Sequence, residues 1–459
     1  MAGISIEFKR LLHKKSLSSL LTAFGYSTIL SSGNWLVGIA LTFLFSYIAA
    51  EITGYYKKMV IYQIYITYTI AISLITSSPL QLLFTRYIAD QLYKSHIDKV
   101  LPNYIGVILI TMILSAIIST PISFFLLKGL PIIYKFIFIF TVTILGAVWV
   151  STSLLSGLKN YKYVFFSFFL SYAFAGILLI FLFKYDFFYE FLAFYIGQIL
   201  LLAFFITKVI LEFPSTKLIS FDFLFNKREV YYSLAFIGLF YNLGVWIDKF
   251  LYWFNNETSQ IIFANIRTSF VYDIPITLSY LTIVPGLALL FIKTETDFAE
   301  YYSSFQLAIT GRGRLDQIYF FANHLIISVK TAIYTTLILQ TIFDIFLILF
   351  ERKIFQALNI SQLYIPIFNL LIIGALLQLL FMVIFTFLSY FDRRKELLII
   401  TFLFFILNLT LTIIFNQFGI VFPGYGYILS LLIATLSGLI FLRRYLNEIL
   451  YRTYMVSNN

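Results

Sequence analysis

Long runs of apolar residues alternate with short polar stretches along the whole chain. A helix needs about 20 mostly apolar residues to cross the hydrocarbon core of a membrane. Runs of that length cover roughly residues 19–50, 60–84, 104–127, 134–157, 163–183, 190–212, 231–254, 270–293, 325–350, 364–390, 397–416 and 426–446. The pattern predicts an all-α polytopic membrane protein with about 12 transmembrane helices.

Composition agrees with this prediction and excludes several classes of protein. The chain is 61% hydrophobic and 12% charged, whereas soluble domains carry about 25% charged residues. It contains no cysteine, which excludes disulfides and thiolate chemistry, and its three histidines lie far apart in sequence. We therefore expect no metal site and no cofactor. The net charge of +11 reflects membrane topology and contact with anionic lipids rather than a nucleic-acid partner.

The distribution of positive charge predicts the orientation in the membrane. Most lysines and arginines lie in the segments that face the cytoplasm if both termini are inside, and cytoplasmic segments carry such an excess. Residues 1–15 lack the features of a cleavable signal peptide, and we assign residues 1–18 to a basic amphipathic segment. Ile4, Phe8, Leu11 and Leu12 recur there at helical spacing among basic residues, which predicts a short amphipathic helix on the inner membrane surface.

Two segments six spans apart share a short sequence pattern. Ser78–Arg86 and Val284–Lys293 each contain a proline, then Leu-Leu-Phe, one further residue and a basic residue, with a one-residue gap between the copies. Separation by an even number of spans gives both copies the same orientation, so the pattern predicts a parallel repeat of two six-helix lobes. We place the lobes at residues 19–222 and 223–459, because the polar stretch 213–229 interrupts the apolar pattern.

Three positions predict bends within the spans. Gly33, in the run Ser31-Ser-Gly-Asn34 of the long first span, indicates a bend or an unwound point rather than a loop. Pro79 and Pro285 lie in the two repeat copies. Each removes a backbone hydrogen-bond donor from its helix, so both are predicted helix bends.

A charged pair, Asp248 and Lys249, lies inside the seventh apolar run. Charges in a bilayer are costly and usually mark a transport path. Lys249 lies about 27 Å from the inner end of this span, in the outer part of the hydrocarbon core. We predict a transport path lined by the pair and by polar or aromatic neighbours: Tyr241, Asn242, Trp246, Asp248, Lys249, Arg267 and Asp273.

A structural interpretation of the pair stays open beside the transport path. Lys249 can snorkel toward the outer headgroups while the pair joins an ion network with another helix. Adjacent helical residues point about 100° apart, so Asp248 and Lys249 need not pair with each other. Asp344, near another predicted outer helix end, is interpreted as structural.

Arg86 and Lys293 occupy equivalent positions of the repeat at the inner ends of their spans. We predict a cytoplasmic gate in which they pair with nearby acids, namely Asp90, Glu295 and Asp297. Ordinary anchoring of basic residues at the inner interface is the alternative.

The motifs of enzymes are weak in this sequence. Glu295-Thr-Asp297 has the acid-x-acid pattern of metal-assisted sugar transfer, but no second acidic cluster accompanies it. Gly311-Arg-Gly313 is too short for a phosphate-binding loop and predicts a turn. We therefore expect a protein that is not an enzyme and carries no nucleotide-driven motor.

Several stretches, densest between residues 230 and 300, carry a resemblance to a known family: Met1–Glu7, Ile29–Trp35, Pro79–Tyr93, Tyr232–Trp253, Tyr272–Pro275 and Glu295–Phe298. They resemble the inner-membrane transporter of Pel exopolysaccharide systems (the PelG type), of the multidrug/oligosaccharidyl-lipid/polysaccharide exporter (MOP) superfamily. The resemblance implies a MATE-like exporter fold and export of an amino-sugar polymer for biofilm matrix across the bacterial inner membrane. Asn34 and Ser78 stand where the resemblance leads us to expect proline and glycine.

The resemblance also implies partners. They are a cytoplasmic nucleotide-sugar glycosyltransferase and a membrane receptor for cyclic di-GMP, besides the polysaccharide itself. The positions that match the family are Asn242, Trp246, Asp248, Lys249, Asp273, Pro285, Glu295 and Asp297, and the roles assigned to them here are hypotheses.

Three alternatives to a polysaccharide exporter remain. A flippase for lipid-linked oligosaccharide must bind pyrophosphate and needs several cations in its cavity, whereas Lys249 is the clearest intramembrane cation. A cation-coupled drug antiporter would want an intramembrane carboxylate in the first lobe, where the sequence shows none. A non-conducting scaffold of a polysaccharide synthase complex would use the stretch Lys293–Asn323 as a docking surface.

Overall fold

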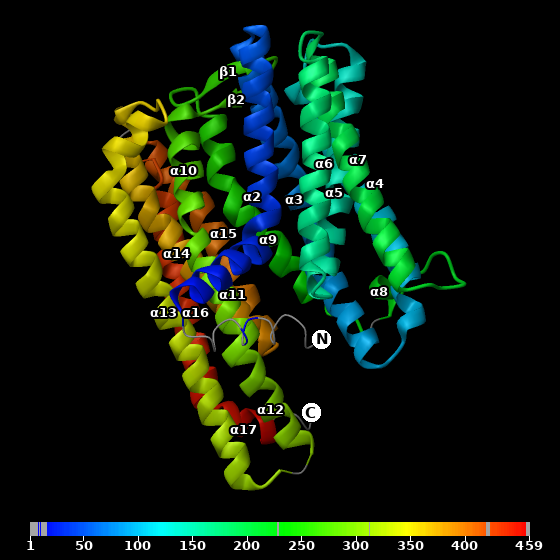
Figure 1. Ribbon diagram of the computed structural model, residues 1–459, viewed down its shortest axis with the longest axis vertical. Coiled ribbons are helices and arrows are strands. Elements are labelled where there is room, and N and C mark those ends of the chain that lie inside the picture. Colours follow the sequence, from blue (N-terminus) through cyan, green and yellow to red (C-terminus); the bar gives the residue numbers. More distant parts are fainter. Residues whose placement is uncertain are drawn as a thin grey trace. The chain divides into compact units, whose positions relative to one another are not determined.

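The computed structural model describes residues 8, 10, 16–226, 229–311, 313–418 and 423–455 (Figure 1). Within these residues, 12 helices are long and apolar enough to cross a membrane, which confirms the predicted polytopic all-α fold. The described residues pack as two compact units, Gly33–Ser269 and the combination of Met1–Ser32 with Phe270–Asn459. The predicted lobes at 19–222 and 223–459 divide the chain by counting spans, and they stay a prediction.

The unit Gly33–Ser269 contains the second part of α2 (Leu17–Thr53), which is helical without interruption through the run Ser31–Asn34. The boundary between the units falls in this helix, between Ser32 and Gly33. The remaining elements of the unit are α3 (Tyr56–Tyr93), η1 (Ile97–Lys99), α4 (Val100–Leu126), α5 (Ile132–Gly157), α6 (Tyr161–Leu182), α7 (Phe187–Glu212), α8 (Asp222–Phe225), α9 (Ser233–Trp253), β1 (Gln260–Phe263) and β2 (Ile266–Thr268). Helix α3 is central to the unit and packs against α4, α5 and α9.

Strands β1 and β2 form a short antiparallel hairpin that the apolar pattern did not predict. Its turn is fixed to the end of α4, because the Asn265 backbone N–H donates to the Leu126 carbonyl over 2.9 Å. Phe263 packs against the Phe187 ring at the start of α7, with ring centroids 4.9 Å apart. The hairpin therefore covers one end of the helix bundle in this unit.

The second unit contains α10 (Phe270–Thr282), α11 (Val284–Lys293), the π-helical segment η2 (Thr294–Phe298), α12 (Ala299–Thr310), α13 (Leu315–Ala357), η3 (Gln362–Tyr364), α14 (Ile365–Tyr390), α15 (Arg394–Asn416), α16 (Tyr425–Asn447) and α17 (Ile449–Met455). Helix α13 packs against α11, α12 and α14, and α16 packs against α14 and α15. Phe8 also belongs to this unit and is buried against the rings of Tyr26 and Phe291. The other apolar residues of the predicted surface helix, Ile4, Leu11 and Leu12, lie outside the described residues.

Helices α12 and α13 form a long antiparallel pair, drawn in green and yellow in Figure 1. Helix α13 has 43 residues, or about 65 Å, roughly twice the thickness of a hydrocarbon core of about 30 Å. The stretch Lys293–Asn323, which lies between the eighth and ninth predicted spans, is mostly helical. Its turn includes Gly311 and Gly313, as predicted, whereas Arg312 lies outside the described residues.

The two copies of the repeat have different helix geometry. Helix α3 continues through Pro79, and the Ser78 hydroxyl donates to the Ile75 carbonyl over 2.9 Å, which is the carbonyl that Pro79 leaves without a donor. In the second copy α10 ends at Thr282, and α11 begins at Val284 with Pro285 in its first turn. The second proline therefore accompanies a one-residue break between the two helices, at Ile283, whose own backbone stays right-handed helical.

Candidate functional site

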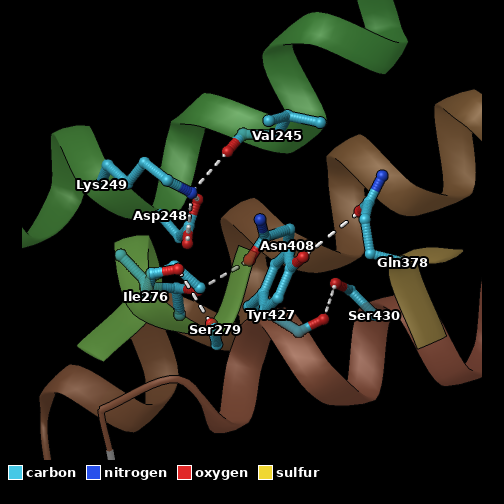
Figure 2. Close-up of polar contacts among 10 residues, drawn as sticks. Val245, Asp248, Lys249, Ile276, Ser279, Gln378, Asn408, Tyr427 and Ser430 are labelled. Atoms are coloured by element: carbon cyan, nitrogen blue, oxygen red, sulfur yellow. Dashed lines mark hydrogen bonds and ion pairs between the residues drawn. The ribbon is translucent and has the colours of Figure 1, made fainter. Parts of the chain in front are cut away.

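Asp248 and Lys249 contact each other on α9, both nearly inaccessible to solvent. Lys249 Nζ lies 3.3 Å from each oxygen of the Asp248 carboxylate and donates to the Val245 carbonyl over 2.8 Å (Figure 2). It also lies 5.8 Å from the centroid of the Trp246 ring. Opposite charges that contact each other lower the cost of burying both.

The direction of the lysine side chain argues against snorkelling toward the predicted outer end of α9. The hydrogen bond of Lys249 Nζ runs back one turn, to Val245. A snorkelling lysine would extend its amine toward the nearest headgroups, which lie beyond the C-terminal end of α9 in the predicted orientation. The pair is thus held within the helix by local contacts.

Helix α9 approaches α3 very closely at Gly238. A Cβ atom on Gly238 would lie 2.4 Å from the carbonyl oxygen of Ser78, so only glycine fits. Asn242, one turn along, donates from Nδ2 to the Gly238 carbonyl over 3.2 Å. The predicted bend at Pro79 and the predicted path residue Asn242 therefore belong to one helix contact. Tyr241 is half-buried on the same helix.

The end of α9 is joined to the hairpin through Tyr68 of α3. Its ring stacks on Trp253, with centroids 4.4 Å apart, and its hydroxyl donates to the Arg267 carbonyl over 2.7 Å. The Arg267 guanidinium donates to the Asn256 side chain over 2.8 Å. The structure thus places Arg267 in the hairpin, where its guanidinium bonds the neutral side chains of Asn256 and Ser259. Asp273 lies in the first turn of α10, in the other unit, and its partnership with the pair stays a prediction.

The second unit buries a group of polar side chains that the sequence reasoning missed. The Tyr427 hydroxyl donates to Gln378 Oε1 over 3.3 Å, and the Ser430 hydroxyl donates to the Tyr427 carbonyl over 2.7 Å (Figure 2). The Thr412 hydroxyl donates to Asn408 Oδ1 over 3.0 Å. An amide in the middle of an apolar span is the signal that could have found them, because a buried amide costs free energy unless it is bonded.

Each predicted gate cation pairs with an acid four residues further along the chain. The first pair lies within α3, and the second runs from the end of α11 into η2. Arg86 Nε lies 3.2 Å from Asp90, and Lys293 Nζ lies 3.0 Å from Asp297. The two pairs have the same spacing of four residues and occupy equivalent positions of the repeat. Glu295, which lies between Lys293 and Asp297 in sequence, is buried in η2. The geometry shows a repeated ion pair, and a role as a gate stays a prediction.

A polar pocket of about 220 Å³ lies next to the first of these pairs, lined by Asp90, Tyr93, Lys94, Glu229 and Tyr231. Lys94 Nζ donates to Glu229 Oε1 over 2.5 Å, and Gln91 donates to Glu229 Oε2 over 2.9 Å. The hydrogen bond from Lys94 holds the pKa of the Glu229 carboxyl below its usual value, and the same bond raises the pKa of Lys94.

The unit Gly33–Ser269 contains a buried carboxylate that the apolar pattern did not single out. Glu190 is fully buried in the first turn of α7, which belongs to a candidate span. Its carboxylate lies 3.4 Å from Lys58 Nζ, and Lys58 donates to the carbonyls of Phe183 and Tyr185. The sequence hid this pair because Glu190 stands at the edge of its apolar run.

Within the described ranges, no group of three or more His, Asp or Glu side chains is placed to hold a metal ion.

Comparisons with known proteins agree with this description. The family model named PelG, described as "Putative exopolysaccharide Exporter (EPS-E)", matches residues 1–454. No curated protein matches the sequence. Among solved structures, an outward-facing multidrug resistance MATE family transporter of the MOP superfamily is similar with a TM-score of 0.62 and 15% identity, over 92% of this chain and 95% of that chain.

Two further solved structures show the same fold. A MATE protein in a straight conformation has a TM-score of 0.60 and 13% identity, over 93% of this chain and 96% of that chain. A MOP superfamily transporter from Pyrococcus furiosus has a TM-score of 0.55 and 12% identity, over 94% of this chain and 96% of that chain. At these identities the likeness establishes the MATE-like fold and leaves cargo and residue roles open.

Proposed function

Because the chain belongs to the PelG family of exopolysaccharide exporters, we propose that it moves an amino-sugar polymer of the Pel type across the bacterial inner membrane for biofilm matrix. Both termini would lie in the cytoplasm. The observation that carries this proposal is the family match over residues 1–454. The twelve candidate spans are consistent with a transporter that works in the membrane.

The charges buried in the described residues support an amine-bearing cargo. Four acids are buried, Glu190, Asp248, Glu295 and Asp344, but only one cation, Lys249. A lipid-linked oligosaccharide carries pyrophosphate, which arginine and lysine recognise. An interior with more acids than cations suits amino sugars better, and this favours the exporter over the flippase, which remains the alternative.

We place the docking surface for a cytoplasmic nucleotide-sugar glycosyltransferase on the antiparallel pair α12–α13. Helix α13 is longer than a bilayer is thick, and the pair exposes Leu307 and Leu315 by 70% and 65%. Exposed apolar residues rimmed by polar groups mark interaction sites. The cyclic di-GMP receptor would belong to the same assembly.

Charge reversal at Arg314 tests this docking surface. Arg314 is 81% exposed and lies 3.3 Å from Asp316, so Arg314→Glu changes the surface without disturbing a core. We expect weaker co-purification of the glycosyltransferase. Lys353→Glu, an exposed position at the other end of α13, is the matched control. Equal recovery from both variants would remove the docking proposal and leave the export proposal intact.

The location of polymer tests export itself. In a strain that lacks this protein but keeps the glycosyltransferase, we expect polymer trapped in the cytoplasm. Restoring the wild-type chain should move the polymer outside the cell. If no polymer formed anywhere without this chain, the non-conducting scaffold of a synthase complex would replace the exporter.

A further inference from the structure

The interruption between α10 and α11 leaves a backbone carbonyl to be satisfied from another helix. Thr282 is the last residue of α10, and the final carbonyls of a helix have no partner within it. Gln340 of α13 donates from Nε2 to the Thr282 carbonyl over 2.9 Å. An amide from a neighbouring helix therefore holds the end of α10.

The same amide holds a carboxylate. Gln340 Nε2 also donates to Asp344 Oδ1 over 2.7 Å, so one NH₂ group joins the helix end to an acid. Asp344 is 5% exposed and Gln340 is fully buried. The second carboxylate oxygen, Asp344 Oδ2, has no hydrogen-bond partner among the described residues.

No cation compensates this carboxylate in the described part of the chain. Among the described residues, the side chain that bonds this carboxylate is Gln340, which is neutral. Among the elements that pack against α13, η3 and α14 carry no charged residue. The others carry Asp273 (α10), Lys293 (α11), Glu295 and Asp297 (η2), Glu300 (α12) and Arg452 (α17). None of these charged groups forms an ion pair with Asp344. Asp248, by contrast, has Lys249 in direct contact.

We propose that Asp344, together with Gln340 and the terminal carbonyl of α10, forms a proton-binding site. A buried carboxylate without a cation is stabilised by taking up a proton, because an isolated charge in an apolar region is costly. The open position at Oδ2 accommodates the proton. Loss of the proton restores a charged acceptor whose bonded donor is Gln340.

Proton binding would change how α13 holds the end of α10. The ionised carboxylate draws the Gln340 amide strongly, since hydrogen bonds to charged acceptors are the stronger ones. The protonated acid accepts more weakly and becomes a donor itself, which frees the amide to reorient. In this way the interruption at Ile283 would respond to protons. A link between this response and polymer export rests on the proposed function, whereas the site itself does not.

Chemical labelling of the purified full-length protein tests the site without reference to export. Dicyclohexylcarbodiimide is an apolar reagent that adds to protonated carboxylic acids. We expect an adduct on Asp344 that declines as pH rises and is absent from Asp344→Asn, which keeps the side-chain shape. Asp248 is the internal control, and we expect it to stay unlabelled because of Lys249.

Infrared difference spectroscopy gives a second readout that needs no reagent access. The stretching band of a protonated carboxylic acid should be present in the wild type and reduced in folded Asp344→Asn. An unchanged band together with no adduct on Asp344 at any pH would overturn the proposal. Labelling suppressed by sodium ions at constant pH, rather than by rising pH, would also overturn it in favour of a metal-cation site.

Discussion

Replacing Lys249 by methionine separates the structural and transport interpretations of the α9 pair. Methionine has a similar length but removes the amine that lies 3.3 Å from both Asp248 carboxylate oxygens and bonds the Val245 carbonyl. Breaking a buried ion pair by removing one partner costs about 3–5 kcal/mol. Since folded proteins are stable by about 5–15 kcal/mol, Lys249→Met should clearly lower the unfolding midpoint and the amount of protein in the membrane.

The double variant Asp248→Asn with Lys249→Met removes both charges. Replacing a buried pair by neutral groups is often close to neutral for stability, so we expect the double variant to regain most of the lost stability. If the pair serves transport, export stays absent in the double variant although the protein is present at normal levels. The assay is denaturant unfolding in detergent for both variants, with membrane abundance and secreted polymer measured in parallel.

Two results would refute this reasoning. Wild-type stability of Lys249→Met would show that burial of the pair costs much less than the geometry indicates. Recovery of both abundance and export in the double variant would show that the pair is structural, and the predicted path would lose its charged members.

Other predictions concern the helix contact and the polar pocket. Gly238→Ala should destabilise by about 1–3 kcal/mol, because overpacking costs that much and the new Cβ would meet the Ser78 carbonyl at 2.4 Å. Gly25→Ala, where nothing lies within 4 Å of a Cβ, should be nearly neutral in the same melting assay. The bond from Lys94 lowers the pKa of Glu229, so its stabilisation is present above the unfolded pKa and disappears as pH falls through the lowered value. The melting temperature of the wild type should therefore be slightly higher than that of Glu229→Gln at neutral pH, and the two should converge as pH falls. A difference in melting temperature that does not change with pH would contradict this prediction.

The sequence predicted the elements that depend on continuous apolar runs. The twelve spans follow from length and hydropathy alone, and the burial of Asp248 and Lys249 follows from their place inside such a run. Their mutual contact did not follow, because side chains about 100° apart on a helix meet only when the long lysine chain folds back. Glu190 escaped prediction for a related reason. It stands where its apolar run begins, and burial there depends on Lys58, which precedes it by more than a hundred residues.

The periodicity of apolar residues does not predict polar contacts between helices that are distant in sequence. The sequence around Gln340 does not indicate that its amide bonds the end of α10, because only packing brings it to Thr282, which is 58 residues away. The β1–β2 hairpin was missed because its strands have four and three residues, too short for alternation to stand out from a loop. The helical structure of residues 294–324 was missed because polar and charged residues interrupt the apolar pattern there, and a search for long apolar runs ends at such residues.

The repeat shows how one sequence pattern leads to two helix geometries. Ser78 precedes the first proline and supplies its own hydroxyl to the carbonyl that the proline leaves open, so α3 is repaired from within. Val284 occupies the equivalent position in the second copy and has no hydroxyl, and Gln340 of α13 bonds the nearby Thr282 carbonyl instead. A helix whose open carbonyl is bonded by its own side chain does not depend on neighbouring helices for that bond. A helix end held by another helix changes when that neighbour moves or when the bond is altered, which makes the interruption at Ile283 the copy able to respond to its surroundings.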